Sequence, residues 1–290
     1  MEIKVGYMIA YDYEYLKLSL PTVYKHADSI TIALDKNRKT FAGETFAVEP
    51  SFFAWLKDFD IANKIRLYED DFYVPGMATR DAEVRERNMI AKFMGEGGWH
   101  IQIDTDEYFV DFKDLVRELK EAEAKYKERK VSFRLYWHTI FKIAPEGYFL
   151  IDDTYEAFAL ATNHPVYEQG RYNHSVENVV LNHVVLHQSW GRSEEELAKK
   201  LRNWSHSDDF DTQAYFEFWK SVNIANYRYI CNFHPLYPDY WKKLKFVAGK
   251  SVDEIISKVP SKLPQKKRPA FHRLQRWLPP VIFNRLQKLN

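Results

Sequence analysis

Strand and helix patterns alternate through the first 120 residues, and this alternation restricts the chain to few folds. Strand character occurs in four stretches, at residues 3–10, 29–34, 64–68 and 99–104. Helical stretches lie between them, at residues 13–26, 51–63 and 79–94. Strands that alternate with helices form βαβ units with parallel strands and right-handed crossovers. The sequence therefore predicts an α/β fold, a Rossmann-type mixed sheet flanked by helices.

The later part of the chain has a different pattern. Residues 130–143 and 147–151 predict a hairpin rich in aromatic residues, and residues 179–187 alternate as a strand. Ser193 and Glu196 have the spacing of a capping box, which marks the start of a helix. Residues 213–250 are again aromatic and predict helix. We therefore expect a helical, aromatic-rich C-terminal part.

Residues 99–109, WHIQIDTDEYF, carry three carboxylates at the end of an alternating apolar strand. They are Asp104, Asp106 and Glu107, and the D-x-D spacing places the first two on one side of an extended backbone. Clustered carboxylates repel one another, so a strand end that collects them commonly binds a cation. Oxygen ligands suit Mn²⁺ and Mg²⁺, which bridge to phosphates. The motif predicts a divalent-metal site that holds a nucleotide diphosphate, unless the acids only cap the following helix.

Other polar residues follow predicted strands and are expected to share this site. Ligands of open parallel sheets bind beyond the carboxyl ends of the strands, where Asp12 and Asp35 join Asp104. His183 and His187 lie four apart in a predicted strand, and therefore on one face. A neutral imidazole at His187 can complete a metal shell begun by carboxylates. The alternative is that both are ordinary core or surface histidines.

Composition excludes several classes of protein. The chain has 290 residues, of which 46% are hydrophobic and 16% aromatic, so it is globular and not disordered. It contains no run of eighteen apolar residues, and its first residues lack the basic and apolar regions of a signal peptide. Cys231 is the only cysteine, which rules out an intramolecular disulfide and fits a reducing compartment. We therefore expect a cytoplasmic protein.

The charge of the chain is divided unevenly. The net charge is only +1, yet the last 36 residues contain nine bases and no acid. Two similar pieces there, FHRLQRWL and FNRLQKL, combine bases with apolar residues as amphipathic helices do. We therefore predict a domain over residues 1–250 and a basic amphipathic tail over residues 251–290. The tail is expected to bind an anionic membrane surface, at the inner face of the membrane, or to dock on the acidic body of the chain. Nucleic acid is not an expected partner, because no recognised nucleic-acid motif accompanies the charge.

The order of these motifs resembles the nucleotide-sugar half of glycosyltransferases with the GT-A fold, most closely the bacterial family-2-like enzymes. Those enzymes have an R-N-x-apolar helix and then a strand that ends in D-x-D-E, here Arg87-Asn88-Met89-Ile90 and Asp104-Thr105-Asp106-Glu107. The stretch HQSWGRSEEELAKKLRNWSHSDDFD is similar to the one that follows their sheet. The resemblance covers roughly residues 3–240. It departs from the family where Ala10-Tyr11-Asp12 replaces the usual acidic pair, and where Asp35 precedes the basic Lys36-Asn37-Arg38-Lys39.

The resemblance implies a metal-dependent transfer of a sugar, with inversion, from a nucleotide-diphosphate donor such as a UDP-sugar to a glycan or lipid-linked acceptor. It divides the domain into a nucleotide-sugar half, about residues 1–110, and an acceptor half, about residues 111–250. Mn²⁺ or Mg²⁺ would be held by Asp106, Asp104 and His187. The donor would be contacted by Ala10, Tyr11, Asp12, Asp35, Arg87 and Asp104.

An inverting transfer needs a carboxylate that takes the proton of the acceptor hydroxyl. Asp152, Asp153 and Glu156 follow the predicted hairpin and are the candidates. Glu156 is favoured, since its apolar neighbours would raise its pKa toward neutral pH. At least two of the three acids are expected to cap a turn or a helix instead. For Asp106, removal is expected to relieve repulsion between the acids and to cost little stability.

Two other functions fit some of the same features. A non-catalytic carbohydrate-binding protein would account for the 19 Tyr and 8 Trp residues. A D-x-D metal-dependent phosphatase also ends a strand in this motif, but such an enzyme has Thr or Val two residues after the second Asp, where this chain has Tyr108. The acids also lie on a later strand than the first. The phosphatase is therefore the weaker alternative.

Overall fold

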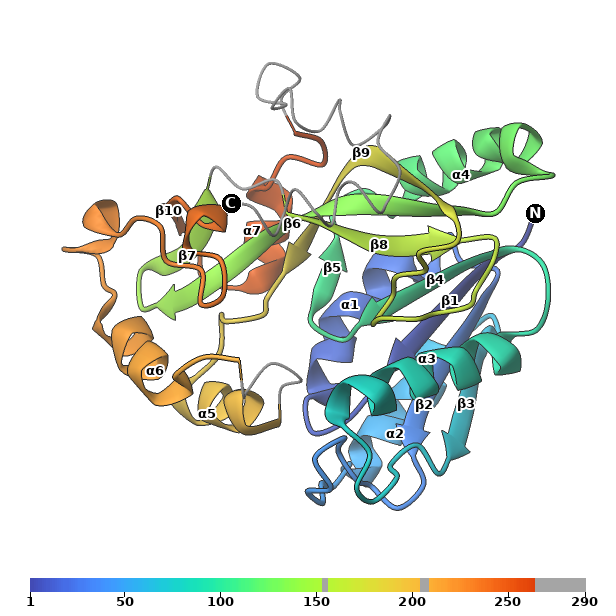
Figure 1. The fold of residues 1–290 in the computed structure, drawn as a ribbon, viewed down its shortest axis with the longest axis horizontal. Helices are drawn as coiled ribbons and strands as arrows, with labels where there is room; N and C mark the ends of the chain where they lie inside the picture. The colour runs from blue at the N-terminus through green and yellow to red at the C-terminus, as the bar shows by residue number, and fades with distance from the viewer. Residues whose placement is uncertain (153–155, 204–208, 264–290) are drawn as a thin grey trace.

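A ten-stranded mixed sheet flanked by helices organises the computed structural model, which describes residues 1–152, 156–203 and 209–263 (Figure 1). The strands are β1 (Ile3–Met8), β2 (Ser29–Asp35), β3 (Ile65–Asp70), β4 (Trp99–Asp104), β5 (Glu107–Phe109), β6 (Val131–Ala144), β7 (Gly147–Asp152), β8 (Ala157–Thr162), β9 (Glu177–His187) and β10 (Lys243–Ala248). Their main order is β10-β7-β6-β8-β4-β1-β2-β3, with β9 paired to β5 and β6. The predicted fold class is confirmed.

The helices within the described residues fall into two groups. Those of the first half are α1 (Leu16–Tyr24), α2 (Pro50–Phe59), α3 (Thr79–Met94) and α4 (Phe112–Tyr126), preceded by the short η1 (Tyr13–Tyr15). Those of the second half are α5 (Glu194–Asn203), α6 (Thr212–Ser221), η2 (Tyr227–Tyr229), η3 (Pro238–Tyr240) and α7 (Val252–Lys258). None of the helices in these ranges is long and apolar enough to cross a membrane.

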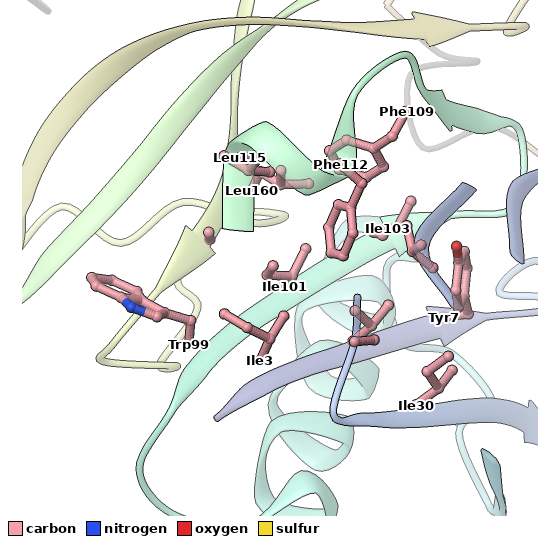
Figure 2. Packing of buried hydrophobic residues seen from close by; sticks show 14 of the residues in the cluster. Ile3, Tyr7, Ile30, Trp99, Ile101, Ile103, Phe109, Phe112, Leu115 and Leu160 are labelled. Carbon is pink, nitrogen blue, oxygen red and sulfur yellow. The ribbon is translucent and has the colours of Figure 1, made fainter. Parts of the chain in front are cut away.

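The four strands β4, β1, β2 and β3 form the parallel part of the sheet, as the βα alternation predicts. β1 and β4 lie in its interior, and Ile3, Val5, Ile101 and Ile103 are fully buried. They pack with Phe112 and other residues of the helices in one large apolar cluster (Figure 2). Strands covered by helices on both faces are largely apolar, and the buried polar side chains Lys4 and Gln102 hydrogen-bond to backbone carbonyl oxygens. The parallel strands therefore end together at one edge, where the D-x-D motif begins.

Helix α3 has the bounds that the sequence predicts and ends as its glycines indicate. Gly95 follows the helix with a φ of +82°, a left-handed conformation that glycine adopts without strain. The buried Lys4 then donates hydrogen bonds from Nζ to the carbonyl oxygens of Gly95 (3.0 Å) and Glu96 (2.7 Å). A cation at the C-terminal end of a helix also favours its dipole. The chain is thereby positioned to enter β4 beside β1.

The sheet contains three strands that the sequence pattern did not predict, β5, β8 and β10. β8 pairs antiparallel with both β4 and β6, and so joins the parallel part of the sheet to the hairpin of β6 and β7. β5 pairs with β9 directly after the D-x-D motif. β10 adds to the edge of β7. These three strands are short, and their places depend on partners that are distant in the sequence.

The prediction of helix over residues 213–250 is wrong for most of that stretch. α6 ends at Ser221, after which Asn223 and Asn226 hydrogen-bond within a turn. Pro235 and Pro238 follow, and proline interrupts helix because it lacks an N–H donor. The stretch ends in β10, and its aromatic side chains, among them Trp219 and Trp241, pack in a separate apolar cluster.

The folded domain extends past residue 251, where the predicted tail begins. Val252, Ile255 and Val259 of the α7 region pack against Tyr108 and Leu186 of the sheet. Beyond α7, Lys262 pairs with Asp114 of α4 at 2.6 Å, and Leu263 donates its backbone N–H to the Asn182 side chain. The rest of the predicted tail, residues 264–290, lies outside the described residues.

Candidate functional site

A large cleft of about 1820 Å³ lies at the carboxyl ends of the parallel strands. It is lined by side chains from both halves of the chain. The lining residues include Asp12, Asp35, Arg87, Asp104, Asp106, Trp137, Glu156, Arg171, His187, Trp190, Arg192, Lys200, Tyr237 and Trp241. The position agrees with the rule that open α/β sheets bind ligands beyond the carboxyl ends of their strands. The structure thus brings Asp12, Asp35, Asp104, Asp106 and His187 to one cavity.

Asp104, the first acid of the motif, is held by two arginines. Arg87 Nη2 donates to its Oδ1 at 2.9 Å, and Arg171 Nη2 lies 3.7 Å from its Oδ2. Burial alone would raise the pKa of Asp104, but the two guanidinium groups hold that pKa below the ordinary range of aspartate. Arg87 also pairs with Glu83 one helical turn earlier. Both Arg87 and Asp104 line the cleft, as the sequence predicts, but here Arg87 serves first to neutralise this acid.

Asp106, the second acid, is almost fully buried and is held by three basic groups. Arg192 Nη2 donates to Oδ2 at 2.6 Å, Lys200 Nζ donates to the same oxygen at 3.3 Å, and His187 Nε2 lies 3.5 Å from Oδ1. Burial would raise the pKa of Asp106, but Lys200, His187 and Arg192 together hold it well below the usual range. The carboxylate is therefore firmly ionised and ion-paired.

Glu107 has a different role from the two aspartates. Its side chain is fully buried and accepts two hydrogen bonds from Arg171, each at 2.7 Å. Trp137 Nε1 donates to it at 2.8 Å, and the backbone N–H of Asp104 at 3.1 Å. Two charge-assisted hydrogen bonds of this kind fix the orientation of the two side chains relative to each other. Glu107 thus ties the D-x-D turn to Arg171, far along the sequence.

Residues 10–12, in the loop after β1, lie at the cleft as predicted, and Asp12 contacts Arg192. Ala10 and Tyr11 line the cavity beside Asp12. Asp12 Oδ2 accepts a hydrogen bond from Arg192 Nη2 at 3.2 Å. Burial raises the pKa of Asp12, with Arg192 opposing that shift. Asp12 and Asp106 therefore share one guanidinium group.

Asp35 lines the cleft, but its carboxylate is occupied with the backbone. Oδ1 accepts the N–H groups of Asn37 (2.8 Å) and Lys39 (3.1 Å), and Oδ2 those of Phe72 (3.0 Å) and Tyr73 (2.9 Å). A carboxylate that accepts several backbone bonds organises the loops around it. Asp35 therefore fixes the loops after β2 and β3 at the edge of the cavity.

The two predicted histidines do not share a site. His187 lines the cleft, whereas His183 Nε2 bonds to Glu118 of α4 at 2.6 Å. The pairing of β9 with β6 changes register between Val180 and Val184, so His183 lies in an irregular part of the strand. Regular alternation, on which the prediction rested, does not hold across such an irregularity.

The structure describes two of the three candidate bases, and it places them at different sites. Glu156 lines the cleft, where Trp241 Nε1 donates to its Oε2 at 3.1 Å. Burial raises the pKa of Glu156, while Trp241 and His187 oppose that shift. Asp152, at the end of β7, is not among the lining residues and lies 3.6 Å from Lys243 Nζ. Asp153 lies outside the described residues.

Seven of the lining residues named above were not among the predicted site residues, and four of the seven contact the carboxylate of Asp104, Asp106 or Glu156. Arg171 lies in a loop whose sequence, EQGRYNHS, has no recognisable motif. Trp241 comes from the aromatic stretch that was expected to be helical. Arg192 and Lys200 lie in the stretch HQSWGRSEEELAKK that carried part of the family resemblance, so its position was a usable indication. The helix there begins with the predicted capping box, in which Ser193 and Glu196 bond reciprocally.

The arrangement does not fit a divalent cation as the side chains lie. Beside a nucleotide diphosphate, a hard cation such as Mn²⁺ or Mg²⁺ is bound by phosphate oxygens and by one or two carboxylates whose oxygens are free to coordinate it. Among residues 1–152, 156–203 and 209–263, no three His, Cys, Asp or Glu side chains are grouped to hold a metal ion. Asp106 Oδ2 accepts from Arg192 and Lys200, and Asp104 Oδ1 accepts from Arg87. Basic side chains thus occupy the positions that the predicted ligands would offer to a metal.

Comparison with known proteins gives structural similarities of limited extent. No protein-family model and no curated protein sequence matches the chain. Among solved structures, S. aureus TarS 1–349 matches with 11% identity and a TM-score of 0.30, over 51% of this chain and 38% of TarS. Mannose-6-phosphate isomerase from Helicobacter pylori matches with 13% identity and a TM-score of 0.30, over 52% of this chain and 56% of the isomerase. CMP:2-keto-3-deoxy-manno-octonic acid synthetase, in complex with CTP, matches with 11% identity and a TM-score of 0.25, over 47% of this chain and 53% of the synthetase. The aligned part spans about half of this chain and assigns it to no family.

Proposed function

We propose that this chain is a transferase that moves a sugar from a nucleotide-diphosphate donor to a glycan or lipid-linked acceptor, with inversion. One observation carries the proposal. The D-x-D motif at the end of β4 and the carboxylate Glu156 line the same cleft, at the carboxyl ends of the parallel strands. In that arrangement a leaving diphosphate and a base for the acceptor hydroxyl have places in one cavity.

The wall of the cleft toward the second half of the chain suits a carbohydrate acceptor. Trp137, Trp190, Tyr237, Tyr240 and Trp241 all line it. Sites for organic ligands combine aromatic walls with a few polar groups that set orientation, and flat rings can pack against the apolar face of a sugar. Glu156 lies in this wall, because Trp137 donates its backbone N–H to the Glu156 carbonyl and Trp241 bonds to the carboxylate. The base is thereby positioned beside the proposed acceptor.

The proposal predicts that a nucleotide stabilises the protein. We expect one nucleoside diphosphate, or its sugar derivative, out of a panel with uracil, guanine, cytosine, adenine and thymine to raise the melting temperature. At a hundredfold excess over the dissociation constant the gain is about 2.7 kcal/mol. The melting temperature is measured with each nucleotide in the presence of Mn²⁺, Mg²⁺ or EDTA, so the experiment also tests the predicted metal cofactor. A protein that responds to oligosaccharides but to no nucleotide would instead be a carbohydrate-binding protein.

We also propose that the basic tail attaches the enzyme to anionic membranes at their cytoplasmic face. Residues 264–290 contain seven bases and no acid. Each base near an anionic surface contributes about 1 kcal/mol of binding energy, which salt weakens. We expect deletion of residues 264–290 to abolish flotation with vesicles that contain anionic lipid. Neutral vesicles are the control.

The deletion should begin after Leu263 because the preceding residues belong to the body. Ser261 accepts the backbone N–H of Val184 at 2.9 Å, and Lys262 pairs with Asp114. If the shortened chain floats as well as the full chain but melts at a lower temperature, the tail binds the acidic body of the protein and not the membrane.

A further inference from the structure

Two basic side chains from one short segment contact Asp106, the residue of the D-x-D motif that the sequence predicts as a metal ligand. Arg192, two residues before α5, and Lys200, within α5, both donate to Oδ2 of Asp106. Both line the cleft. The Arg192 side chain is only 2% exposed and that of Lys200 is 17% exposed, so neither is an ordinary surface base.

The surroundings of the two cations hold them in place. Ser189 accepts through its carbonyl oxygen from Arg192 Nε at 3.0 Å and from Lys200 Nζ at 3.2 Å. The Arg192 guanidinium also bonds to Asp12 and lies 4.7 Å from the centre of the Tyr15 ring. A charged group fixed before the reaction stabilises developing charge without the cost of reorganisation.

Each cation has donor capacity left for a ligand. Guanidinium has five N–H donors and ammonium three. In the described part of the chain, Arg192 Nη1 donates no hydrogen bond and Lys200 Nζ donates two, to Asp106 and to Ser189. Guanidinium binds phosphate oxygens in a bidentate manner, and ammonium binds them as a point charge.

We propose that Arg192 and Lys200, in place of a divalent cation, neutralise the diphosphate of the donor, and that Asp106 is a positioning residue for both. This inference rests on the proposed function. In the transfer, the acceptor oxygen forms a bond to the anomeric carbon while the bond from that carbon to the phosphate oxygen breaks. The electron pair of the broken bond passes to the diphosphate beside Arg192 and Lys200, and the hydroxyl proton passes to Glu156. Charge and atoms balance without a metal.

The inference predicts nucleotide binding that does not depend on metal and does depend on Lys200. Isothermal titration of the full chain with the nucleoside diphosphate that stabilises it best should give the same affinity in EDTA as in Mn²⁺. Lys200→Met should weaken that affinity about 10- to 100-fold, the usual value of a hydrogen bond to a charged group. Lys200→Arg keeps the charge and should retain most of the binding.

Arg202→Met is the matched control. Arg202 lies on the same helix, but its side chain is 62% exposed and its Nε lies 4.0 Å from Glu44. Arg202→Met removes the same charge from α5 without changing a residue that contacts Asp106, and should leave the affinity for the nucleotide unchanged. Circular dichroism and the melting temperature establish that each variant is folded.

The possible results separate the two proposals. Binding that appears only with Mn²⁺ or Mg²⁺ overturns the inference and leaves the proposed function standing. Binding in EDTA that Lys200→Met and Arg202→Met affect equally also overturns the inference, because the effect would then be one of overall charge. If no nucleotide binds under any condition, the proposed function fails and the inference fails with it.

Discussion

Replacing Glu156 by glutamine should lower the rate of sugar transfer by about 10²- to 10⁴-fold, the usual contribution of a general base. Glutamine has the shape of glutamate and can still accept the hydrogen bond from Trp241, but it cannot take a proton from the acceptor. The measurement is single-turnover transfer to the acceptor, with nucleotide affinity measured in parallel. Affinity should stay within about threefold of the parent, since the carboxylate acts on the acceptor and not on the diphosphate.

Asp152→Asn is the matched control for this prediction. Asp152 is the neighbouring candidate acid, but it lies outside the cleft lining and faces Lys243. Its replacement should leave the rate nearly unchanged. If Asp152→Asn lowers the rate as much as Glu156→Gln does, Glu156 is not the base.

The pH dependence of transfer should identify the same group. Burial raises the pKa of Glu156, so its carboxylate becomes protonated at a higher pH than an ordinary glutamate, whose pKa is about 4.3. The active form is the deprotonated one, and the rate should therefore fall as the pH decreases through this raised pKa. Glu156→Gln should remove that acid limb. The charged form of a buried acid also costs folding free energy as the pH rises through its pKa, so the glutamine variant should not be less stable at neutral pH.

Replacing Asp106 by alanine should lower the free energy of unfolding by about 3–5 kcal/mol, the usual loss when one partner of a buried ion pair is removed. Arg192 and Lys200 would then face each other without the carboxylate that both now contact. For a chain of this length the melting temperature should fall by roughly 10 °C. The sequence-based expectation of a small cost rested on repulsion between acids, and that premise is wrong because Asp106 is surrounded by basic groups.

Two further variants test this account of Asp106. Glu69→Ala removes an exposed carboxylate that pairs with Arg38 at 2.6 Å, and should cost less than about 1 kcal/mol. The double variant Asp106→Ala, Lys200→Met removes one unpaired cation together with the acid, and should be more stable than Asp106→Ala alone. If Lys200→Met changes the free energy of unfolding by the same amount in the parent and in Asp106→Ala, then Lys200 and Asp106 are not coupled.

The sequence by itself determined the parallel half of the sheet and the position of the D-x-D turn. Strand β1 is largely apolar, β4 alternates apolar with polar residues, and helices such as α3 have clear ends, because burial and backbone geometry there depend on neighbouring residues. The rule that ligands bind at the carboxyl ends of parallel strands then located the cleft. Asp12, Asp35, Asp104, Asp106 and His187 were placed there by these local patterns, whereas Glu156 was chosen because the family resemblance requires a base.

Only the tertiary structure decided what neutralises the acids. Arg171, Arg192 and Lys200 lie 64 to 180 residues from the carboxylates that they contact, and no local pattern links such partners. The same holds for Trp241, which reaches Glu156 across 85 residues. A cluster of acids in a sequence shows that cations must be near, because the carboxylates cannot be buried uncompensated. Whether those cations are metals or basic side chains depends on chain segments that only the folded sheet brings together.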